Sequence, residues 1–453
     1  MGLILFIVLA ALAIVLAIHA CKTEKGKKQW RKERLIVRAI QFVLVIVSML
    51  TVEQKWRFVP VLGFLAVLLI IAGLKALIGR KKDDSVKKKG GVIASCAFSV
   101  LFMALLLVPA FVFTGYNGLP VSGSHKVAKV SAILVDSSRP DPFEQDGSFR
   151  EVPAHFYYPA DGGDKGCPLV VFSHGAFGYY QSNTSTYMEL ASNGYVVVAL
   201  DHPHHAFFTK DTDGSTVIVN RDFMNTAMTL GSITDAQEKY KIYTQWMALR
   251  TADMGFVLDK LKTAAQAGEP GENWFVSGED IDAIRSVLAM TDISKIGVMG
   301  HSMGGATAVA IGRERSDVSA VIDIDGTMLS EYTGVDDEKL EVRNESYNVP
   351  ILEFVNWDSY SMLPEYRKEG IIYPNEVLIR DAVKGYSVTI RDTRHMDFTD
   401  LPLLSPTLAG LLGEMGTGER STEETMMIVN RLVLEFFNCY LKGEGTFSAQ
   451  EVY

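Results

Sequence analysis

The chain has 453 residues, which is too long for one average domain and predicts two or three structural units. Its net charge of −9 is unevenly distributed, because residues 1–115 hold 17 Lys and Arg against 5 Asp and Glu, whereas the rest hold 27 against 48. The acidic excess of the larger part argues against a nucleic-acid partner, and four cysteines are too few for a disulfide framework.

The basic part contains four apolar runs, each close to the ~20 residues that a helix needs to cross a bilayer core. They cover residues 2–20, 35–52, 58–78 and 92–113. Arg38 and Lys75 lie near the ends of their runs, so we expect these side chains to extend to the membrane surface. The sequence therefore predicts a helical transmembrane region of about four spans over residues 1–115.

The loops between these runs predict the orientation. Residues 21–34 and 79–90 are rich in Lys and Arg, and such short basic loops stay in the cytoplasm. Everything after residue 113 is then expected on the extracytoplasmic side of the plasma membrane, in a multi-pass protein. A cleaved signal peptide, or a lipoprotein site ending at Cys21, is the alternative for the first run, which lacks the basic start of a signal peptide.

Residues 116–130 are predicted to link this region to a second domain over residues 131–453. Apolar runs of strand length recur in that domain, rich in Val and Ile and typical of buried parallel strands. They lie at 132–135, 154–158, 169–172, 195–200, 295–299, 320–324, 351–355 and 387–390, and helical patterns lie at 236–261, 306–315 and 423–441. This alternation predicts a mostly parallel, doubly wound α/β sheet with helices on both faces. Residues 207–234 and 329–348 are expected to form loops or lids over one end of that sheet.

The stretch "IGVMGHSMGG" places Ser302 between a predicted strand and a predicted helix. This is the context of a nucleophile elbow, a sharp turn that exposes a serine hydroxyl at the top of an α/β-hydrolase sheet. Gly300 and Gly304 flank the serine, since a Cβ at either position would clash with the neighbouring elements. The sequence therefore predicts the α/β-hydrolase fold with Ser302 as nucleophile.

A serine nucleophile needs a base and a group that orients the base. In this fold the chain order is serine, acid, histidine, and His395 is the histidine that follows Ser302. Two acids are candidates for the group that orients His395: Asp325 ends the next strand, and Asp358 follows the strand after that. Asp323 shares a strand face with Asp325 and is expected to be a buried support.

An oxyanion hole requires two backbone N–H groups. Met303, directly after the nucleophile, is expected to supply one. The loop "SHGAFG" after an early strand is expected to supply the other, from Ala176 or Phe177.

Five blocks together resemble the plasma-type platelet-activating factor acetylhydrolases and their bacterial relatives. They read "VVFSHGAFG", "GYVVVALDHPHHA", "KIGVMGHSMGGATA", "VIDIDG" and "RHMDF". The resemblance covers roughly residues 150–440 and implies Asp325 as the acid, with Ala176 and Met303 as oxyanion donors. It also implies that the protein needs no metal and no other cofactor. The family usually carries bulkier residues at positions 176 and 303, which leaves the acyl preference of this chain open.

The histidines of "DHPHH", residues 201–205, could suggest a zinc site. No acidic ligand is interleaved in the usual manner, so we expect no metal there and expect His202 to support the loops of the active site.

The preferred function is a membrane-tethered serine esterase that hydrolyses short or modified acyl esters, with phospholipids among the candidate substrates. A carboxylesterase or lipase acting on other esters is the first alternative, and a non-catalytic membrane sensor that keeps the fold is the second. The expected partners are an ester or lipid substrate and membrane lipid, and the sequence does not specify an oligomeric state.

Residues 400–415, "DLPLLSPTLAGLLGEM", are unusually rich in leucine. We expect either a core helix under the sheet or, as the resembling family has at a similar place, an interfacial segment that enters the outer leaflet.

Overall fold

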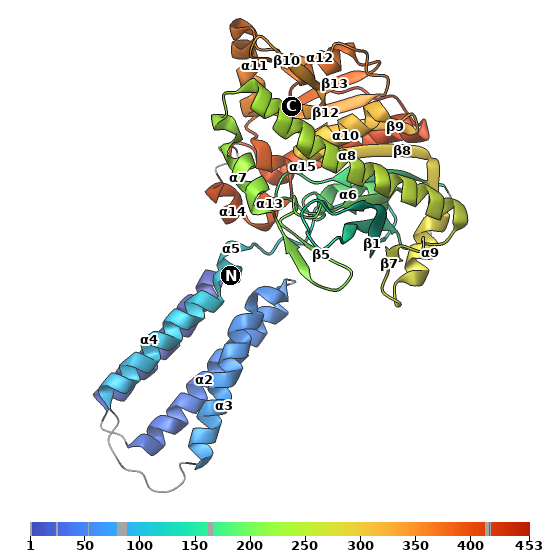
Figure 1. Cartoon of the computed structure of the whole chain (residues 1–453). Helices are drawn as coiled ribbons and strands as arrows, with labels where there is room; N and C mark the ends of the chain where they lie inside the picture. Colours follow the sequence, from blue (N-terminus) through green and yellow to red (C-terminus); the bar gives the residue numbers. More distant parts are fainter. Residues whose placement is uncertain are drawn as a thin grey trace. The chain divides into compact units, whose positions relative to one another are not determined.

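A computed structural model describes residues 2–23, 26–52, 54–78, 88–161, 166–412, 416 and 418–453. The chain forms two compact units, and each is described by itself (Figure 1). The helical unit comprises Met1–Gly118 and Pro402–Leu412, and the sheet unit comprises Leu119–Leu401 and Gly413–Tyr453. Most of the second predicted basic loop, residues 79–87, lies outside the described residues.

The described part of the helical unit consists of helices, most of which are apolar. They are α1 (Gly2–Lys22), α2 (Lys27–Leu50), η1 (Lys55–Phe58), α3 (Val59–Ile78), α4 (Lys89–Leu106) and α5 (Val108–Val112). In the part of the chain that the structure describes, three stretches are long and apolar enough to cross a membrane, namely Gly2–Lys22, Lys55–Leu77 and Lys89–Leu106. They correspond to the first, third and fourth predicted spans. Helix α2 covers the second predicted run without being among the three, so its crossing stays a prediction.

Arg38 differs from its predicted position at the membrane surface. Its side chain is only 4% exposed and lies inside the helical unit. The guanidinium donates to Gln41 Oε1 at 2.7 Å and to Ser99 Oγ at 2.8 Å, and Gln41 in turn donates to the carbonyl of Leu9. The prediction was wrong because neighbouring helices supply polar partners for Arg38, so the side chain has no need to reach water.

Residues 402–412 of the leucine-rich segment belong to the helical unit rather than to the core of the sheet. The segment forms α13 (Leu401–Leu404) and α14 (Pro406–Leu411). Thr114 N–H donates to the carbonyl of Leu404 at 2.8 Å, and Ser405 Oγ donates to the carbonyl of Val112 at 2.8 Å. Leu411 and Leu412 are 82% and 59% exposed, so the core-helix interpretation is wrong for these side chains. The end of the segment, residues 413–415, lies outside the described residues.

The sheet unit contains a nine-stranded sheet of order β13-β12-β9-β8-β3-β4-β2-β1-β7. Its strands are β1 (Val127–Pro140), β2 (Phe149–Pro159), β3 (Cys167–Ser173), β4 (Val196–Leu200), β7 (Trp274–Phe275), β8 (Thr291–His301), β9 (Val318–Ile324), β12 (Ile351–Asn356) and β13 (Gly385–Ile390). Pairs from β13 to β4 are parallel, whereas β2, β1 and β7 pair antiparallel. The central strands are buried on both faces, which explains their continuous apolar sequences.

Helices cover both faces of this sheet (Figure 1). One core contains residues of α8 (Ala236–Ala267), α9 (Ile281–Met290), α10 (Met303–Glu314) and α12 (Pro374–Asp381). The opposite core contains residues of α6 (Thr184–Ser192), α15 (Thr422–Phe437) and the π-helical turn η5 (Asn438–Lys442). The predicted α/β architecture is therefore confirmed.

The main differences from the sequence prediction lie at boundaries and insertions. Strand β1 begins at Val127, inside the predicted linker, because Val127–Val130 pair with the end of β2. The two insertions contain structure of their own. The first forms β5 (Phe208–Lys210), β6 (Thr216–Ile218), α7 (Arg221–Thr229) and η2 (Leu230–Ser232), and the second includes η3 (Leu329–Glu331), β10 (Tyr332–Asp336) and β11 (Lys339–Val342). Helix α11 (Trp357–Glu369) and the turn η4 (His395–Phe398) complete the unit.

Candidate active site

Ser302 occupies the turn between β8 and α10, as the nucleophile elbow predicts. Its φ of 56° is rare for a residue with a side chain, and its N–H donates to the carbonyl of Ile324 at 2.8 Å. A Cβ at Gly300 would lie 2.2 Å from Gly304 C, and a Cβ at Gly304 would lie 1.9 Å from Ser173 O. The sheet and the helix approach so closely here that only glycine fits on either side of the serine.

The structure brings His395 and Asp325 together. The loop after β13 carries His395, and Asp325 follows β9 with a φ of 58°. Asp325 Oδ2 lies 2.6 Å from His395 Nδ1, which is a short hydrogen bond typical of a charged acceptor. Both side chains line a cavity that also contains Ser302. In this arrangement the carboxylate fixes Nδ1 as the protonated nitrogen and leaves Nε2 to accept a proton.

Asn356 holds the carboxylate of Asp325 from the other side. Its backbone N–H donates to Oδ1 at 2.7 Å, and its side-chain amide lies 3.0 and 2.9 Å from the two carboxylate oxygens. Burial acts to raise the pKa of Asp325, but the hydrogen bonds from His395 and Asn356 outweigh it and keep the pKa below its ordinary value. Asp325 is therefore ionised over the neutral pH range, as an acid that orients a histidine must be.

The other two acids considered from the sequence lie elsewhere. Asp358 is 60% exposed and forms an ion pair with Arg394 at 2.9 Å, in the first turn of α11. Asp323 is fully buried and accepts a hydrogen bond from the N–H of Gly326 at 2.9 Å. Burial raises the pKa of Asp323 well above its ordinary value. The geometry thus favours Asp325 over Asp358 as the partner of His395 and gives Asp323 a supporting position below the turn.

The loop after β3 lies directly against the nucleophile. A Cβ at Gly175 would approach within 3.1 Å of Ser302 Cβ, so the loop backbone is as close as packing allows. Phe177 N–H already donates to the carbonyl of His205 at 3.1 Å, which leaves Ala176 as the better donor of the two considered. Among the described contacts, the N–H of Ala176 has no protein acceptor. Met303 is the first residue of α10, where an N–H has no acceptor within the helix.

The cavity around these residues has a volume of about 240 Å³. Its lining contains both apolar and polar side chains. The apolar side chains are Leu230, Trp246, Met303, Leu329, Phe354 and Val355, and the polar ones besides the three already described are Thr327, Asn356, Ser359, Tyr373 and Asn375. Leu230 comes from the first insertion and Leu329 from the second, so both insertions contribute to the lining of the cavity.

Several of these residues were missed from the sequence. Asn356 was part of the stretch "FVNW" and could have been noticed as a polar residue at the end of a buried strand. Asn375 has no such local signal, because its contacts are distant in sequence: it donates to Glu353 at 3.0 Å and accepts from the N–H of Met328 at 3.0 Å. Glu353 itself is buried, and burial raises its pKa to about 7.

The histidines of residues 201–205 point to different partners rather than to a common centre. His202 Nδ1 lies 2.9 Å from Asp253, His204 lies 3.3 Å from Glu144, and His205 stacks on Phe223 with 3.7 Å between ring centroids. Within the described ranges, no cluster of three His, Cys, Asp or Glu side chains could hold a metal ion.

Comparison with known proteins agrees with this architecture. Residues 147–450, about two thirds of the chain, match the family model of platelet-activating factor acetylhydrolase, isoform II. The chain belongs to this family. The family model begins after the helical part of the N-terminal region, so membership concerns the sheet unit.

Similar proteins include curated enzymes and one solved esterase. Platelet-activating factor acetylhydrolase of Cavia porcellus is 24% identical over 302 residues, which cover 66% of this chain and 62% of the relative. A probable 1-alkyl-2-acetylglycerophosphocholine esterase of Arthroderma benhamiae is 28% identical over 167 residues, covering 36% and 33% of the two chains. The ferulic acid esterase of Streptomyces cinnamoneus shares the fold, with a TM-score of 0.51 and 23% identity over 72% of this chain and 93% of the esterase chain. This chain thus spans about three fifths of the length of the Cavia porcellus enzyme.

Proposed function

We propose that the protein is a serine esterase that hydrolyses short or modified acyl esters. The observation that carries this proposal is the 2.6 Å pairing of His395 Nδ1 with Asp325, in the same small cavity as a serine held in a strained turn. Family membership supports it, because the curated relatives are named as acetylhydrolases or as an acetylglycerophosphocholine esterase.

The chemistry follows from the roles of the three side chains. Ser302 Oγ attacks the ester carbonyl while His395 Nε2 takes its proton, and the negative charge on the carbonyl oxygen is bound by the N–H groups of Ala176 and Met303. Collapse of this intermediate breaks the bond to the alcohol, which leaves with the proton from His395. A water molecule then attacks the acyl-enzyme by the same route and releases the acid, and Asp325 keeps the imidazole in the required tautomer throughout.

The cavity supports a short acyl group. Its ~240 Å³ is below the ~300–1,000 Å³ of common small-molecule sites. Trp246, Leu230 and Leu329 offer apolar surface to an acyl chain, and Tyr373 and Asn375 offer polar groups. A short acyl ester of a phospholipid fits both this mixed lining and the names of the relatives.

We further propose that the protein is held in the plasma membrane, with the sheet unit on the extracytoplasmic side. Three helices that are long and apolar enough to cross a membrane support membrane association, and the basic loop at residues 21–34 supports the orientation. A membrane-impermeant maleimide added to intact cells should label Ser124→Cys and spare Lys28→Cys. The opposite pattern would reverse the orientation.

The activity is tested on the full-length protein in membranes. The substrates are a water-soluble 4-nitrophenyl acetate and two phospholipids that differ only in the sn-2 chain, acetyl in one and palmitoyl in the other. We expect hydrolysis of both acetyl esters, little of the palmitoyl ester, and none above background in Ser302→Ala. Hydrolysis of 4-nitrophenyl acetate alone would favour the general carboxylesterase, and equal rates for the wild type and Ser302→Ala would exclude the esterase.

A further inference from the structure

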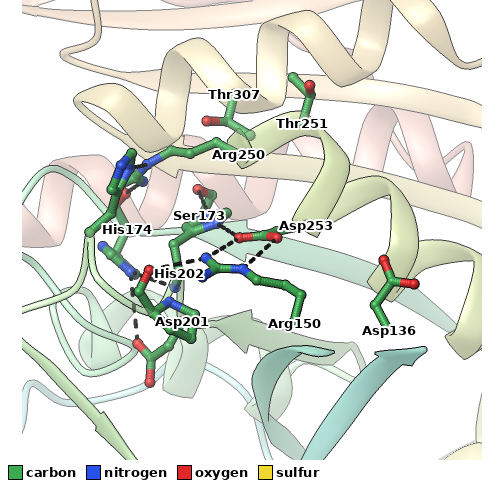
Figure 2. A network of polar contacts seen from close by, with 12 residues as sticks. Asp136, Arg150, Ser173, His174, Asp201, His202, Arg250, Thr251, Asp253 and Thr307 are labelled. Atoms are coloured by element: carbon green, nitrogen blue, oxygen red, sulfur yellow. Dashed lines mark hydrogen bonds and ion pairs between the residues drawn. The ribbon is translucent and has the colours of Figure 1, made fainter. Parts of the chain in front are cut away.

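Arg250 is a buried arginine that contacts the loop of the candidate oxyanion hole. It lies in α8 and its side chain is fully buried. Its guanidinium donates to the carbonyl of His174, to the carbonyl of Gly175 at 3.3 Å and to His205 Nδ1 at 3.4 Å. Figure 2 shows Arg250 extending toward His174, away from the cluster around Asp253. A buried cation whose described partners are carbonyls and a histidine is unusual, because burial of a charge normally calls for a counterion.

The nearest acid on the same helix is already occupied. Asp253 lies one turn after Arg250, but its carboxylate binds Arg150 at 2.8 Å, Arg139 at 2.7 Å and His202 at 2.9 Å. Burial lowers the pKa of Arg250 to about 9, and the attraction of Asp253 opposes this decrease, so the guanidinium remains charged at neutral pH. The hydrogen bonds of Arg250, however, are directed at two successive peptide carbonyls.

Besides Arg250, the carbonyl of Gly175 accepts from the N–H of Gly178 at 3.2 Å and from the ring of His174. The ring of His174 accepts from the N–H of His202 at Nε2, with 3.1 Å between the nitrogens. Burial, together with the charge of Arg250, keeps the pKa of His174 well below its ordinary value, so the ring is neutral. Its proton is then on Nδ1, which lies 2.6 Å from Gly175 O. Two side chains thus donate to one peptide oxygen.

That oxygen belongs to the same planar peptide unit as the N–H of Ala176. Because the C=O and N–H of a trans peptide point in opposite directions, fixing the oxygen fixes the direction of the N–H. Donors at the oxygen also polarise the unit and make its N–H a stronger donor. Arg250 adds a full positive charge to this effect, in an interior of low dielectric.

From this geometry we infer that Arg250 is a positioning residue for ester hydrolysis, which aims and polarises the Ala176 amide at the developing oxyanion. The inference rests on the proposed function, because it requires an ester carbonyl at Ser302. It goes beyond that function by assigning part of the transition-state stabilisation to a residue of α8 that does not touch substrate.

The test compares two conservative changes in the full-length protein, solubilised in detergent. Arg250→Lys keeps the charge but replaces a planar, two-armed donor with a single ammonium group. Arg150→Lys is the matched control: Arg150 is equally buried and also lies in the network of Figure 2, but its hydrogen bonds go to Asp253, Asp141 and the carbonyl of Pro203. Turnover of 4-nitrophenyl acetate is expressed per site titrated with a fluorophosphonate, which corrects for misfolded protein.

We expect Arg250→Lys to lower kcat about 10- to 100-fold with KM nearly unchanged, since the interaction strengthens only as the oxyanion forms. The inhibition constant of a trifluoromethyl ketone, whose adduct with Ser302 carries an oxyanion, should rise by a similar factor. Arg150→Lys should lower the melting temperature and leave kcat per site within about threefold of the wild type. If Arg250→Lys does not fold, Arg250→Gln replaces it with the same expectation.

Two outcomes would overturn the inference. One is an unchanged kcat per titrated site in the Arg250 variant, and the other is an equal loss in the Arg150 control, which would make the effect merely structural. A separate result would exclude the proposed function: the wild type shows no turnover, or its turnover is the same in Ser302→Ala.

Discussion

Besides the chain of Ser131, His155 and Asp201, the sheet unit contains two sets of Ser, His and Asp whose hydrogen bonds are similar. In one, His202 bridges Ser173 at 2.8 Å and Asp253 at 2.9 Å. In the other, His395 pairs with Asp325 at 2.6 Å beside Ser302. The first set is fully buried, whereas the second lines a cavity. Hydrogen-bond geometry alone therefore does not identify an active site. Access of a substrate to the serine and the backbone conformation of the serine distinguish the two sets.

The two sets also differ in charge. The carboxylate of Asp253 is surrounded by cations, with Arg150 and Arg139 bound directly and Arg250 one turn away on α8. Burial keeps His202 neutral by lowering its pKa to about 3. Asp325, in contrast, lies close to two further buried acids, Asp323 and Glu353, whose pKa values burial raises. The acid of the buried set is thus paired mainly with arginines, whereas the acid of the open set is bound by the imidazole and by the amide groups of Asn356.

The largest expected difference is between the two aspartates. Asp325→Asn should lower kcat about 10⁴-fold with little change in stability, because the amide would favour the wrong tautomer of His395. Asp253→Asn should instead destabilise the fold by about 3–5 kcal/mol, since it leaves buried Arg150 without its main counterion. Kinetics per titrated site and thermal unfolding measure the two effects.

Asp358→Asn is the control for this pair, because Asp358 is exposed and paired with Arg394. Its kcat should stay within about threefold of the wild type. A large loss in Asp358→Asn together with a small one in Asp325→Asn would transfer the orienting role to Asp358.

The buried acids near Asp325 predict that the stability of the protein depends on pH, through Glu353. Its pKa is about 7 in the folded protein, above the ordinary value of 4.5, so the folded state binds the proton more tightly. Stability should therefore fall as pH rises from about 4.5 to 7. Glu353→Gln keeps the acceptor for Asn375 and removes the titration, so it should gain up to about 3 kcal/mol relative to the wild type at pH 8 and much less at pH 5. An equal gain at both pH values, measured by urea unfolding, would contradict the raised pKa.

The smallest effect is expected at the buried serine. Ser173→Ala removes a hydroxyl that is hydrogen-bonded to His202, which should cost about 1 kcal/mol of stability. Its kcat per titrated site should remain close to that of the wild type. A loss of several orders of magnitude would mean that the buried set takes part in the chemistry.

The predictable part of the fold was its sheet, because buried parallel strands have a distinct local pattern. All eight predicted strand runs overlap strands of the nine-stranded sheet, and β7, only two residues long, was missed. The segment 402–412 was harder, because its leucine content is the same for a core helix and for an exposed one. Only its hydrogen bonds to Val112 and Thr114 show where it belongs.

The residues of the candidate site also differ in whether the sequence alone could predict them. Ser302 and His395 were proposed from a motif and from chain order, which are properties of the sequence itself. Arg250 was not noticed, since an arginine in a long mixed helix usually faces solvent, and its role depends on a loop about 75 residues earlier. The acid stayed open between Asp325 and Asp358 from the residues alone, because both follow strands at the same edge of the sheet, and the resemblance to the family favoured Asp325.

The most direct test of the account is to find which serine reacts. Membranes containing the full-length protein are treated with a fluorophosphonate probe, digested, and analysed by mass spectrometry for the labelled peptide. The account predicts that the label is on Ser302, that it is lost in Ser302→Ala, and that it persists in Ser173→Ala. A label on Ser173, or no label on Ser302 in a folded protein, would contradict the assignment of the open Ser302, His395 and Asp325 set as the active site.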